Sequence, residues 1–253
     1  DAMAFYKYLK HLCVWRINIG DEGMARIARF VKGSRSLTRL DIFDCGMGAE
    51  GCNQMSGALR GTQSLTRLTL DHNPLTDHGA GVLATGLGLG CPLQSLSLRY
   101  CGLTPDAAET VAHILSASLL KDLDVQGNEF QPLGAATIIS ALQNNTTLVK
   151  LGMACTSWGP EPVVTESLIT AMSLNSTCNE YNLDGNPMGN ASAQRLAAQI
   201  KISTHVTSLV TTEQLSREVF HEIVKITDAN RKEWIKKNKK KKKGKGKKGG
   251  KKK

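Results

Sequence analysis

Three side chains near the start of the chain are of the types that form a nucleophilic site. His11, Cys13 and Asp41 could lie near one another on adjacent strands, as a Cys-His-Asp group in which the imidazole activates the thiol. Such a site needs a pocket and an oriented base, and an open sheet face supplies neither by default. We therefore favour the alternative in which the three residues are ordinary surface or packing residues.

The stretch Thr85–Gly90, TGLGLG, resembles part of a glycine-rich nucleotide loop. Leu87 falls on an apolar helix position, which places these glycines at a helix end and not between a strand and a helix. The seven cysteines form no CxxC pair, and no Cys/His group has the spacing of metal ligands. The sequence therefore predicts no metal site, no cofactor and no enzymatic activity.

A repeat with a period of about 28 residues determines where these side chains lie. Four segments share the pattern L-x-x-L-x-L-x-x-N/C-x-L: LTRLDIFDCGM from Leu37, LTRLTLDHNPL from Leu65, LQSLSLRYCGL from Leu93 and LKDLDVQGNEF from Leu120. Further copies begin at Leu9, Leu148 and Cys178, and a degenerate last strand lies near Val206. The alternation within each segment predicts a short strand.

The second half of each repeat predicts an amphipathic helix. Apolar residues recur 18 and 22 positions after the first leucine, for example Ile27 and Val31 or Met55 and Leu59. Positions four apart share one helix face. The copy from Leu148 is shifted by two residues, which indicates an insertion around residues 159–162. One strand–helix unit cannot bury its own apolar face, so the units must stack.

These seven copies resemble the leucine-rich repeat family, of the ribonuclease-inhibitor type, over roughly residues 3–211. The resemblance implies an α/β fold, a right-handed strand–helix solenoid with a parallel concave sheet. In this family the Asn/Cys slot satisfies backbone groups of the loop, so Cys45 and Cys101 are interpreted as structural. That slot is occupied by Cys45, Asn73, Cys101, Asn128 and Asn186, whereas Ile17 and Thr156 depart from the pattern.

The chain divides into three expected parts. Residues 1–211 form the solenoid, which begins inside a repeat because Met3 falls in a helix slot, so we expect that it is truncated at its N-terminus. Residues 212–238 form a capping helix, with Thr212 as a plausible N-cap. Residues 239–253 form a Lys/Gly tail that we expect to be disordered, since like charges repel and nothing apolar is available to bury.

All of the excess positive charge lies at the carboxyl end. The chain carries a net charge of +10, but 13 lysines and no acid follow Trp234, which leaves 19 basic and 22 acidic residues before them. This end is predicted to attach to an acidic surface, such as tubulin or nucleic acid. The predicted polyanion-binding residues are Lys239, Lys240, Lys241, Lys242, Lys243, Lys245, Lys247 and Lys248.

The outward positions of the strands give the candidate binding face. They combine aromatic residues, which are frequent binding hot spots, with charges of both signs, which suit a protein partner better than a phosphate backbone. The aromatics could equally cover the sheet or lie under an earlier segment. The predicted partner-binding residues are Trp15, Arg39, Asp41, Phe43, Arg67, Asp71, Arg99, Tyr100, Asp122, Asp124 and Asp184.

Three functions fit these patterns. The first is a non-catalytic protein-interaction scaffold in the cytoplasm, with the cytoskeleton or cilium as candidate locations, because the repeats resemble those of NOD-like receptors and of a ciliary dynein regulatory complex subunit. The second is a nuclear or nucleolar nucleic-acid-associated protein, although the tail lacks aromatic residues and arginine for base recognition. The third is an activator similar to the GTPase-activating protein for Ran, whose tail is acidic. No apolar run approaches the ~18 residues of a membrane span.

Overall fold

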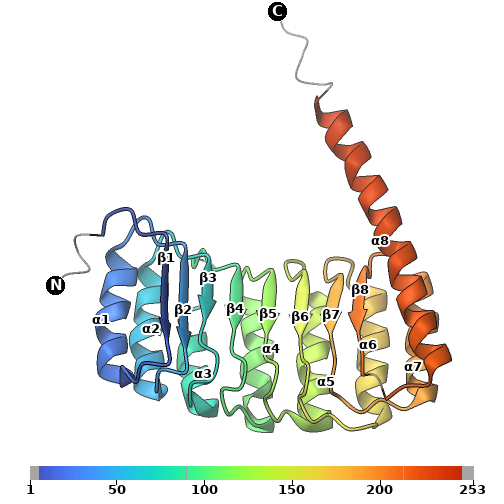
Figure 1. Cartoon of the computed structure of the whole chain (residues 1–253), viewed down its shortest axis with the longest axis horizontal. Coiled ribbons are helices and arrows are strands. Elements are labelled where there is room, and N and C mark those ends of the chain that lie inside the picture. Colours follow the sequence, from blue (N-terminus) through green and yellow to red (C-terminus); the bar gives the residue numbers. More distant parts are fainter. Residues whose placement is uncertain (1–5, 89, 213, 247–253) are drawn as a thin grey trace, which may run out of the picture.

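The computed structural model describes residues 6–88, 90–212 and 214–246, with side chains described up to Lys239. Eight parallel strands form one sheet in chain order, and helices alternate with them (Figure 1). The strands are β1 (His11–Trp15), β2 (Arg39–Phe43), β3 (Arg67–Thr69), β4 (Ser95–Ser97), β5 (Asp122–Asp124), β6 (Lys150–Gly152), β7 (Glu180–Asn182) and β8 (Ser208–Val210). The helices are α1 (Gly20–Gly33), α2 (Ala49–Gly61), α3 (Thr76–Ala84), α4 (Ala108–Ala117), α5 (Gln131–Ala141), α6 (Pro162–Leu174), α7 (Asn190–Ile202) and α8 (Arg217–Gly246).

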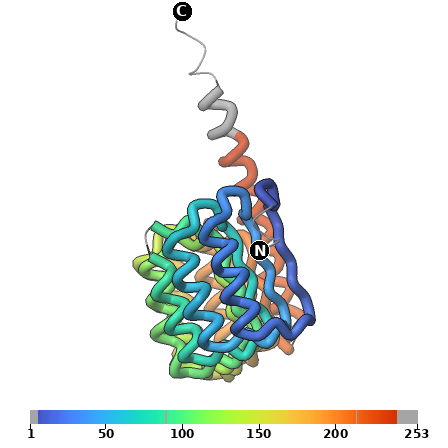
Figure 2. Tube along the Cα trace, turned by 90° about the vertical axis from the view of Figure 1, so that its left-hand side faces the viewer, coloured from blue at the N-terminus to red at the C-terminus, as the bar shows by residue number. Residues whose placement is uncertain are grey.

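The strands and helices form two layers, seen end-on in Figure 2, and one continuous cluster of buried apolar residues fills the space between them. Equivalent repeat positions pair across the sheet, as in the register Leu40–Leu68–Leu96. The predicted helix positions, such as Ile27, Met55 and Val111, are buried together with these leucines. This arrangement confirms the strand–helix solenoid that the repeat predicts, and it leaves the alternate strand residues on the outer face of the sheet.

The Asn/Cys slot satisfies the backbone where each strand turns into its loop. Asn73 Oδ1 accepts hydrogen bonds from the backbone N–H groups of Cys45 and Met47, and its Nδ2 donates to the carbonyls of Ile42 and Leu70. Asn128 and Asn186 make equivalent bonds. Cys45 Sγ lies 3.2 Å from the carbonyl oxygen of Phe43, to which the buried thiol donates. The cysteine in this slot is therefore structural.

The glycine-rich stretch marks a close contact between helix ends. A Cβ atom on Gly86 would lie 2.6 Å from the carbonyl oxygen of Ser56. Helix α3 ends at Ala84, so the glycines follow a helix, as expected, and let it approach α2. This local packing accounts for Gly86 without a nucleotide.

Helix α8 closes the end of the stack. Leu215, Val219 and Ile223 are buried near α7 and β8, and Asn230 Nδ2 donates hydrogen bonds of 3.0 Å to the carbonyls of Ile200 and Val206. Asn230 thus satisfies one carbonyl in the last turn of α7 and one in the loop after it. Asn175 Nδ2 does the same between earlier repeats, where it donates to the carbonyls of Leu142 and Asn145.

Both ends of α8 differ from the expected boundaries. The helix begins at Arg217 and not at Thr212, whose Oγ1 accepts a hydrogen bond from the N–H of Gln214 before the helix. It continues beyond residue 238 to Gly246 and projects from the solenoid (Figure 1). The expectation of disorder from residue 239, and of a helix end after Lys243, therefore differs from the structure. Lysine favours helix, and an interior glycine costs only about 1 kcal/mol. Residues 247–253, including Lys247 and Lys248, lie outside the described part.

Candidate partner-binding face

Four rings form a continuous row along the carboxyl ends of β1–β4. Trp15 and Phe43 have ring centroids 6.1 Å apart, Phe43 and His72 4.7 Å, and His72 and Tyr100 4.6 Å with an interplanar angle of 19°. We call Trp15, Phe43, His72 and Tyr100 the aromatic ladder. The guanidinium carbon of Arg16 lies 5.3 Å from the Trp15 ring centroid, which adds a cation–π contact at one end. Trp15 and Tyr100 remain 59% and 42% exposed.

A left-handed residue after each of β1–β7 explains how two of these rings reach the ladder. His72 and Tyr100 lie one repeat position later than Trp15 and Phe43, and their φ angles are 58° and 52°. The same position has positive φ in the other repeats too, at Arg16, Asp44, Gly127, Cys155 and Gly185. This conformation turns the chain at the sheet edge, so the position after the strand faces the same row of side chains.

Asp71, Arg99 and Asp124 form a polar network beside the ladder. Asp71 Oδ1 accepts bonds from Ser97 Oγ at 2.6 Å and from the backbone N–H of Arg99 at 3.0 Å. Arg99 donates through Nε to Asp124 Oδ2 at 2.8 Å. Burial raises the pKa of Asp71 despite these bonds. Burial would lower the pKa of Arg99, but the hydrogen bond and the charges of Asp124 and Asp71 outweigh it, so the pKa is raised.

Asp41 is held by two neighbours on the same face. Its Oδ2 lies 2.7 Å from Arg39 Nε and 2.7 Å from His11 Nε2, and only 8% of the residue is exposed. Cys13 pairs with Asp41 in the strand register, but no hydrogen bond joins its thiol to His11 among the described residues. The imidazole is therefore engaged by a carboxylate that Arg39 shares, and the nucleophile arrangement considered above is not assembled.

The structure places the predicted partner-binding residues in different surroundings. Trp15, Phe43 and Tyr100 meet in the ladder, and Arg39 and Arg67 are exposed on neighbouring strands. Asp41 and Asp71 are buried and hydrogen-bonded within the chain, so they hold other side chains in place. Asp122 accepts from Ser95 Oγ, whereas Asp184 lies after β7, about 14 Å of sheet beyond β4, and accepts from the N–H of Gly185.

His72 belongs to this face but was not among the predicted residues. The signal was available, because His72 occupies the same repeat position as Tyr100 and follows Phe43 by one repeat and one residue. Comparing equivalent strand positions between repeats does not reveal the contact, because the His72 ring reaches Phe43 only through the left-handed conformation that follows the strand.

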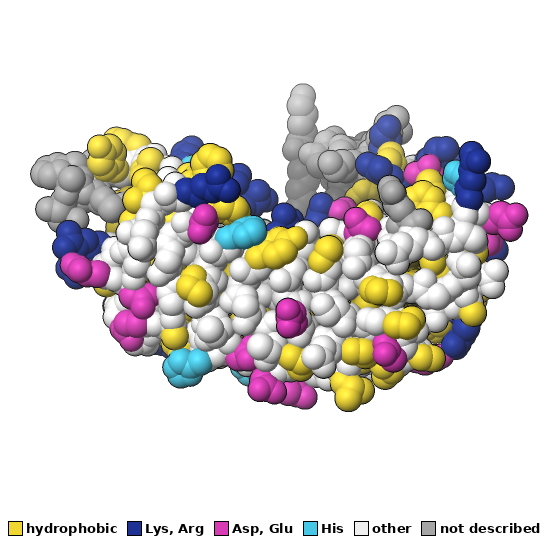
Figure 3. Space-filling view, turned by 60° about the horizontal axis from the view of Figure 1, so that its bottom comes forward, with side chains coloured by type: hydrophobic (Ala, Val, Ile, Leu, Met, Phe, Trp, Pro, Cys, Tyr) yellow, Lys and Arg dark blue, Asp and Glu magenta, His cyan; other side chains and the backbone are white. Residues whose placement is uncertain are grey.

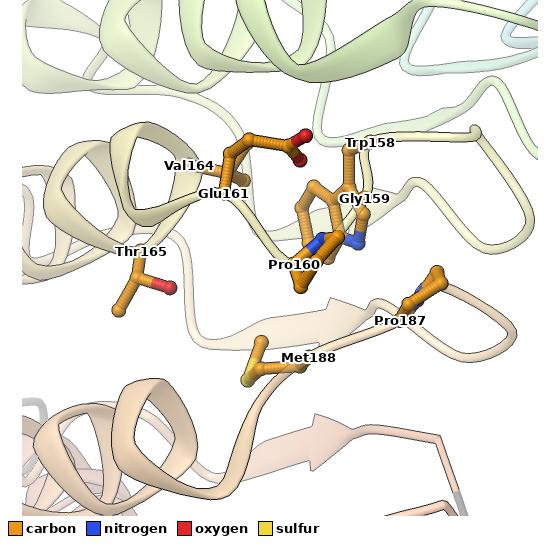
Figure 4. Close-up of a pocket in the computed structure, with 8 residues that line it drawn as sticks. All are labelled: Trp158, Gly159, Pro160, Glu161, Val164, Thr165, Pro187 and Met188. Carbon is orange, nitrogen blue, oxygen red and sulfur yellow. The ribbon is translucent and has the colours of Figure 1, made fainter.

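Two hollows among the described residues do not resemble small-molecule sites. One of about 230 Å³ lies on the sheet over β2–β5 and has Arg39, Arg67, Asp71 and Arg99 in its lining, whereas ligand pockets are mostly apolar. Another, beside the inserted loop before α6, is lined by Trp158, Pro160, Pro187 and Met188 (Figure 4). Its volume of about 10 Å³ matches no more than a water molecule.

Surface composition is mixed outside the sheet face as well. On the side formed by the lower ends of the elements in Figure 1, acidic and hydrophobic side chains are scattered over the surface, and most of the visible Lys and Arg side chains lie toward its upper edge and its sides (Figure 3). Among the described residues, no group of three or more His, Cys, Asp or Glu side chains is placed to hold a metal ion. Within the same described part, no helix has the length and apolar character to cross a membrane.

Comparisons with known proteins agree with the repeat. The model of a family described as "Leucine Rich repeat" matches residues 33–53 and 62–84. Human NACHT, LRR and PYD domains-containing protein 5 is 31% identical over 185 residues, covering 72% of this chain and 15% of that protein. Ribonuclease inhibitor from Sus scrofa is 27% identical over 191 residues, covering 74% of this chain and 42% of that protein. The chain thus spans less than half the length of these relatives.

Among solved structures, the tropomodulin C-terminal domain of Caenorhabditis elegans is similar with a TM-score of 0.39 and 11% identity, covering 66% of this chain and 86% of that one.

The stacked strand–helix units and the Asn/Cys slot define a leucine-rich repeat solenoid. The chain is a leucine-rich repeat protein with ribonuclease-inhibitor-like repeats that resemble those of NOD-like receptors. Proteins of this class generally act as non-catalytic protein-interaction scaffolds.

Proposed function

We propose that this chain is a non-catalytic scaffold that binds a protein partner on the concave face of β1–β5. The observation that carries the proposal is the aromatic ladder, four rings in contact that remain partly exposed on the same sheet face as Arg39, Arg67 and Arg99. Aromatic and arginine side chains dominate binding energy at protein interfaces. Because the rings already contact one another, little side-chain freedom remains to be lost when a partner covers them.

The polar network supports the same proposal. Asp41 Oδ2 pairs with Arg39 and Asp71 Oδ1 accepts from Ser97 Oγ, so both carboxylates are already hydrogen-bonded on the sheet before a partner covers them. Arg99 is fixed by Asp124 and presents a guanidinium in one orientation. Side chains held in this way favour recognition of a defined shape over non-specific adhesion.

The test is affinity capture from cell extract with quantitative mass spectrometry. We expect Trp15→Ala combined with Tyr100→Ala to lose the specifically bound proteins of the intact chain. Leu133→Ala is the matched control, because Leu133 is 75% exposed on α5, away from the sheet face. Recovery of the same proteins by all three chains would show that the concave face is not the binding site.

We infer further that the lysine-rich end of α8 attaches the scaffold to an acidic surface, with a tubulin polymer as the first candidate. Arg231, Lys232, Lys236, Lys237 and Lys239 are exposed on the projecting helix. The test is co-sedimentation with microtubules and with RNA, comparing the intact chain with a chain ending at Ile235 across a salt series. Binding should weaken with rising salt and vanish on truncation. Absence of binding to either ligand at low salt would refute the attachment.

The tail experiment also decides between two locations. Microtubule binding favours a cytoplasmic role at the cytoskeleton or cilium, whereas RNA binding alone favours the nuclear alternative. The Ran-type alternative is tested separately by adding the chain to Ran-GTP. We expect no increase in hydrolysis, because Arg39 and Arg99 are both held by carboxylates on the sheet.

A further inference from the structure

The concave face over β1–β4 has three parallel rows of different character. The first row, at the amino ends of the strands, contains His11, Arg39, Arg67 and Ser95, which pair in register. The middle row contains Cys13, Asp41, Thr69 and Ser97. The aromatic ladder is the third. Over β1–β3, the longer side chains of the first row and of the ladder therefore flank the shorter middle row, and we call the space between them the groove. Over β4, the first row ends in the short Ser95. The hollow of about 230 Å³ overlaps this groove over β2–β4 and extends to β5. Its lining includes Arg39, Arg67, Thr69 and Ser97 and none of the four ladder residues.

The dimensions of this groove match one kind of secondary structure. The first row and the ends of the strands are four residues apart, which is about 13 Å at the strand rise of about 3.3 Å per residue. A helix with its side chains is about 10–12 Å across, so it would contact both outer rows. A single extended strand is less than half as wide and would leave one row uncovered. Four strands make the rows about 14 Å long, which accommodates two to three helical turns.

The charge along the first row specifies one flank of such a helix. Arg67 makes no ion pair with a described residue, and Arg39 shares one oxygen of Asp41 with His11. The row is therefore basic over β2 and β3. It becomes acidic at Asp122 on β5, where a carboxylate of a partner would be repelled.

We propose that this groove binds an amphipathic helix of the partner, with its apolar face on the aromatic ladder and its carboxylates on Arg67 and Arg39. This inference depends on the proposed function, because it specifies the partner of the same face. It adds the secondary structure of the partner segment, the sign of its charged flank and its position over β2 and β3.

The experiment uses a displayed library of helical peptides with randomised faces, selected against the intact chain. We expect the enriched peptides to carry aromatic or aliphatic residues at i, i+3, i+4 and i+7 and Asp or Glu along one flank. Arg67→Glu should weaken binding of an enriched peptide at least tenfold, and changing its flank to lysine should restore binding to that variant. Arg29→Glu is the matched control, because Arg29 is exposed on α1.

Three results would overturn the inference. Enriched peptides with a basic or neutral flank would refute the charge assignment, and enrichment of proline-containing sequences would refute the helix. Peptides that bind Arg67→Glu as well as the original chain would refute the position. In each case, the proposed function would still stand if the chain with Trp15→Ala and Tyr100→Ala failed to capture the specifically bound proteins from cell extract. If capture from extract also proved insensitive to that double change, both proposals would fail together.

Discussion

The ring of Tyr100 occupies the space in which a side chain on Gly127 would begin. A Cβ atom on Gly127 would lie 2.2 Å from Cε1 of Tyr100, and Gly127 itself has a φ of +72°. Gln126 Nε2 donates to the Tyr100 hydroxyl at 3.2 Å. A glycine in the fifth repeat therefore allows the last ring of the aromatic ladder to lie against the next repeat.

Gly127→Ala should disturb both stability and binding. A left-handed alanine costs about 1–2 kcal/mol, and the new methyl group would displace the Tyr100 ring. Urea unfolding measures the first effect, and affinity for a captured partner or an enriched peptide measures the second. Gly102→Ala is the matched control, since Gly102 has a φ of +70° but a Cβ atom there would meet nothing within 4 Å. Equal affinity of the two variants would contradict the assigned role of Tyr100.

Asp71→Asn should change how stability depends on pH. Burial raises the pKa of Asp71 above 3.8, so between pH 3.8 and the raised value the folded chain binds more protons than the unfolded chain. The original chain therefore loses stability from this group as pH rises through that window. Asparagine avoids the loss and still accepts from Ser97 Oγ and Arg99 N–H. The stability of the variant relative to the original should rise from pH 4 upward in urea unfolding; a fall would contradict the assignment.

Asn73→Ala should be among the most destabilising single changes in the solenoid. It removes the acceptor for two buried N–H groups and the donor to two carbonyls, and each unsatisfied buried group costs about 1–3 kcal/mol. We expect a loss of about 3–5 kcal/mol in denaturant unfolding. Asn53→Ala, on the exposed side of α2, should change stability by less than about 0.5 kcal/mol. Similar losses for both would show that the slot is not a structural requirement.

The two halves of α8 should contribute differently to stability. Ending the chain at Ile235 retains Leu215, Val219, Ile223 and Asn230, so the thermal midpoint should remain unchanged. Ile223→Ala removes a fully buried side chain and should cost about 2–5 kcal/mol. Differential scanning calorimetry of the two variants is the measurement. A large shift on truncation would mean that the projecting part also supports the fold.

The period of the repeat was sufficient to predict the fold, because every repeat buries the same positions. Leu40, Leu68 and Leu96 pair in register as the pattern requires, and Asn73 has the expected role. The start of α8 was less predictable. Threonine is a common N-cap residue, but the helix begins five residues after Thr212, at Arg217. A local sequence pattern does not show how the end of the stack packs.

The site could be predicted as a face but not as a set of contacts. Alternation places Asp41 and Asp71 on the outer side of the sheet, where exposure is expected. Their burial arises from neighbouring side chains on the sheet, Arg39 and His11 in one case and Ser97 in the other. Such bonds depend on rotamers and cross-strand distances, which a repeat pattern does not encode. His72 was missed for the same reason, because its contact requires a backbone conformation outside the strand.

The continuity of α8 joins the solenoid and the basic end through one helix. Asn230 and Ile223 anchor the helix to the last repeat, and the helix then runs on from Arg231 to Gly246, about 24 Å at 1.5 Å per residue. Two ligands held on the sheet face and at this end would be separated by the length of the projecting helix. The chain can bind both ligands at once only when their spacing matches the spacing of its two sites. Binding at the first site then raises the effective concentration at the second, and ligands at another spacing receive no such increase in affinity.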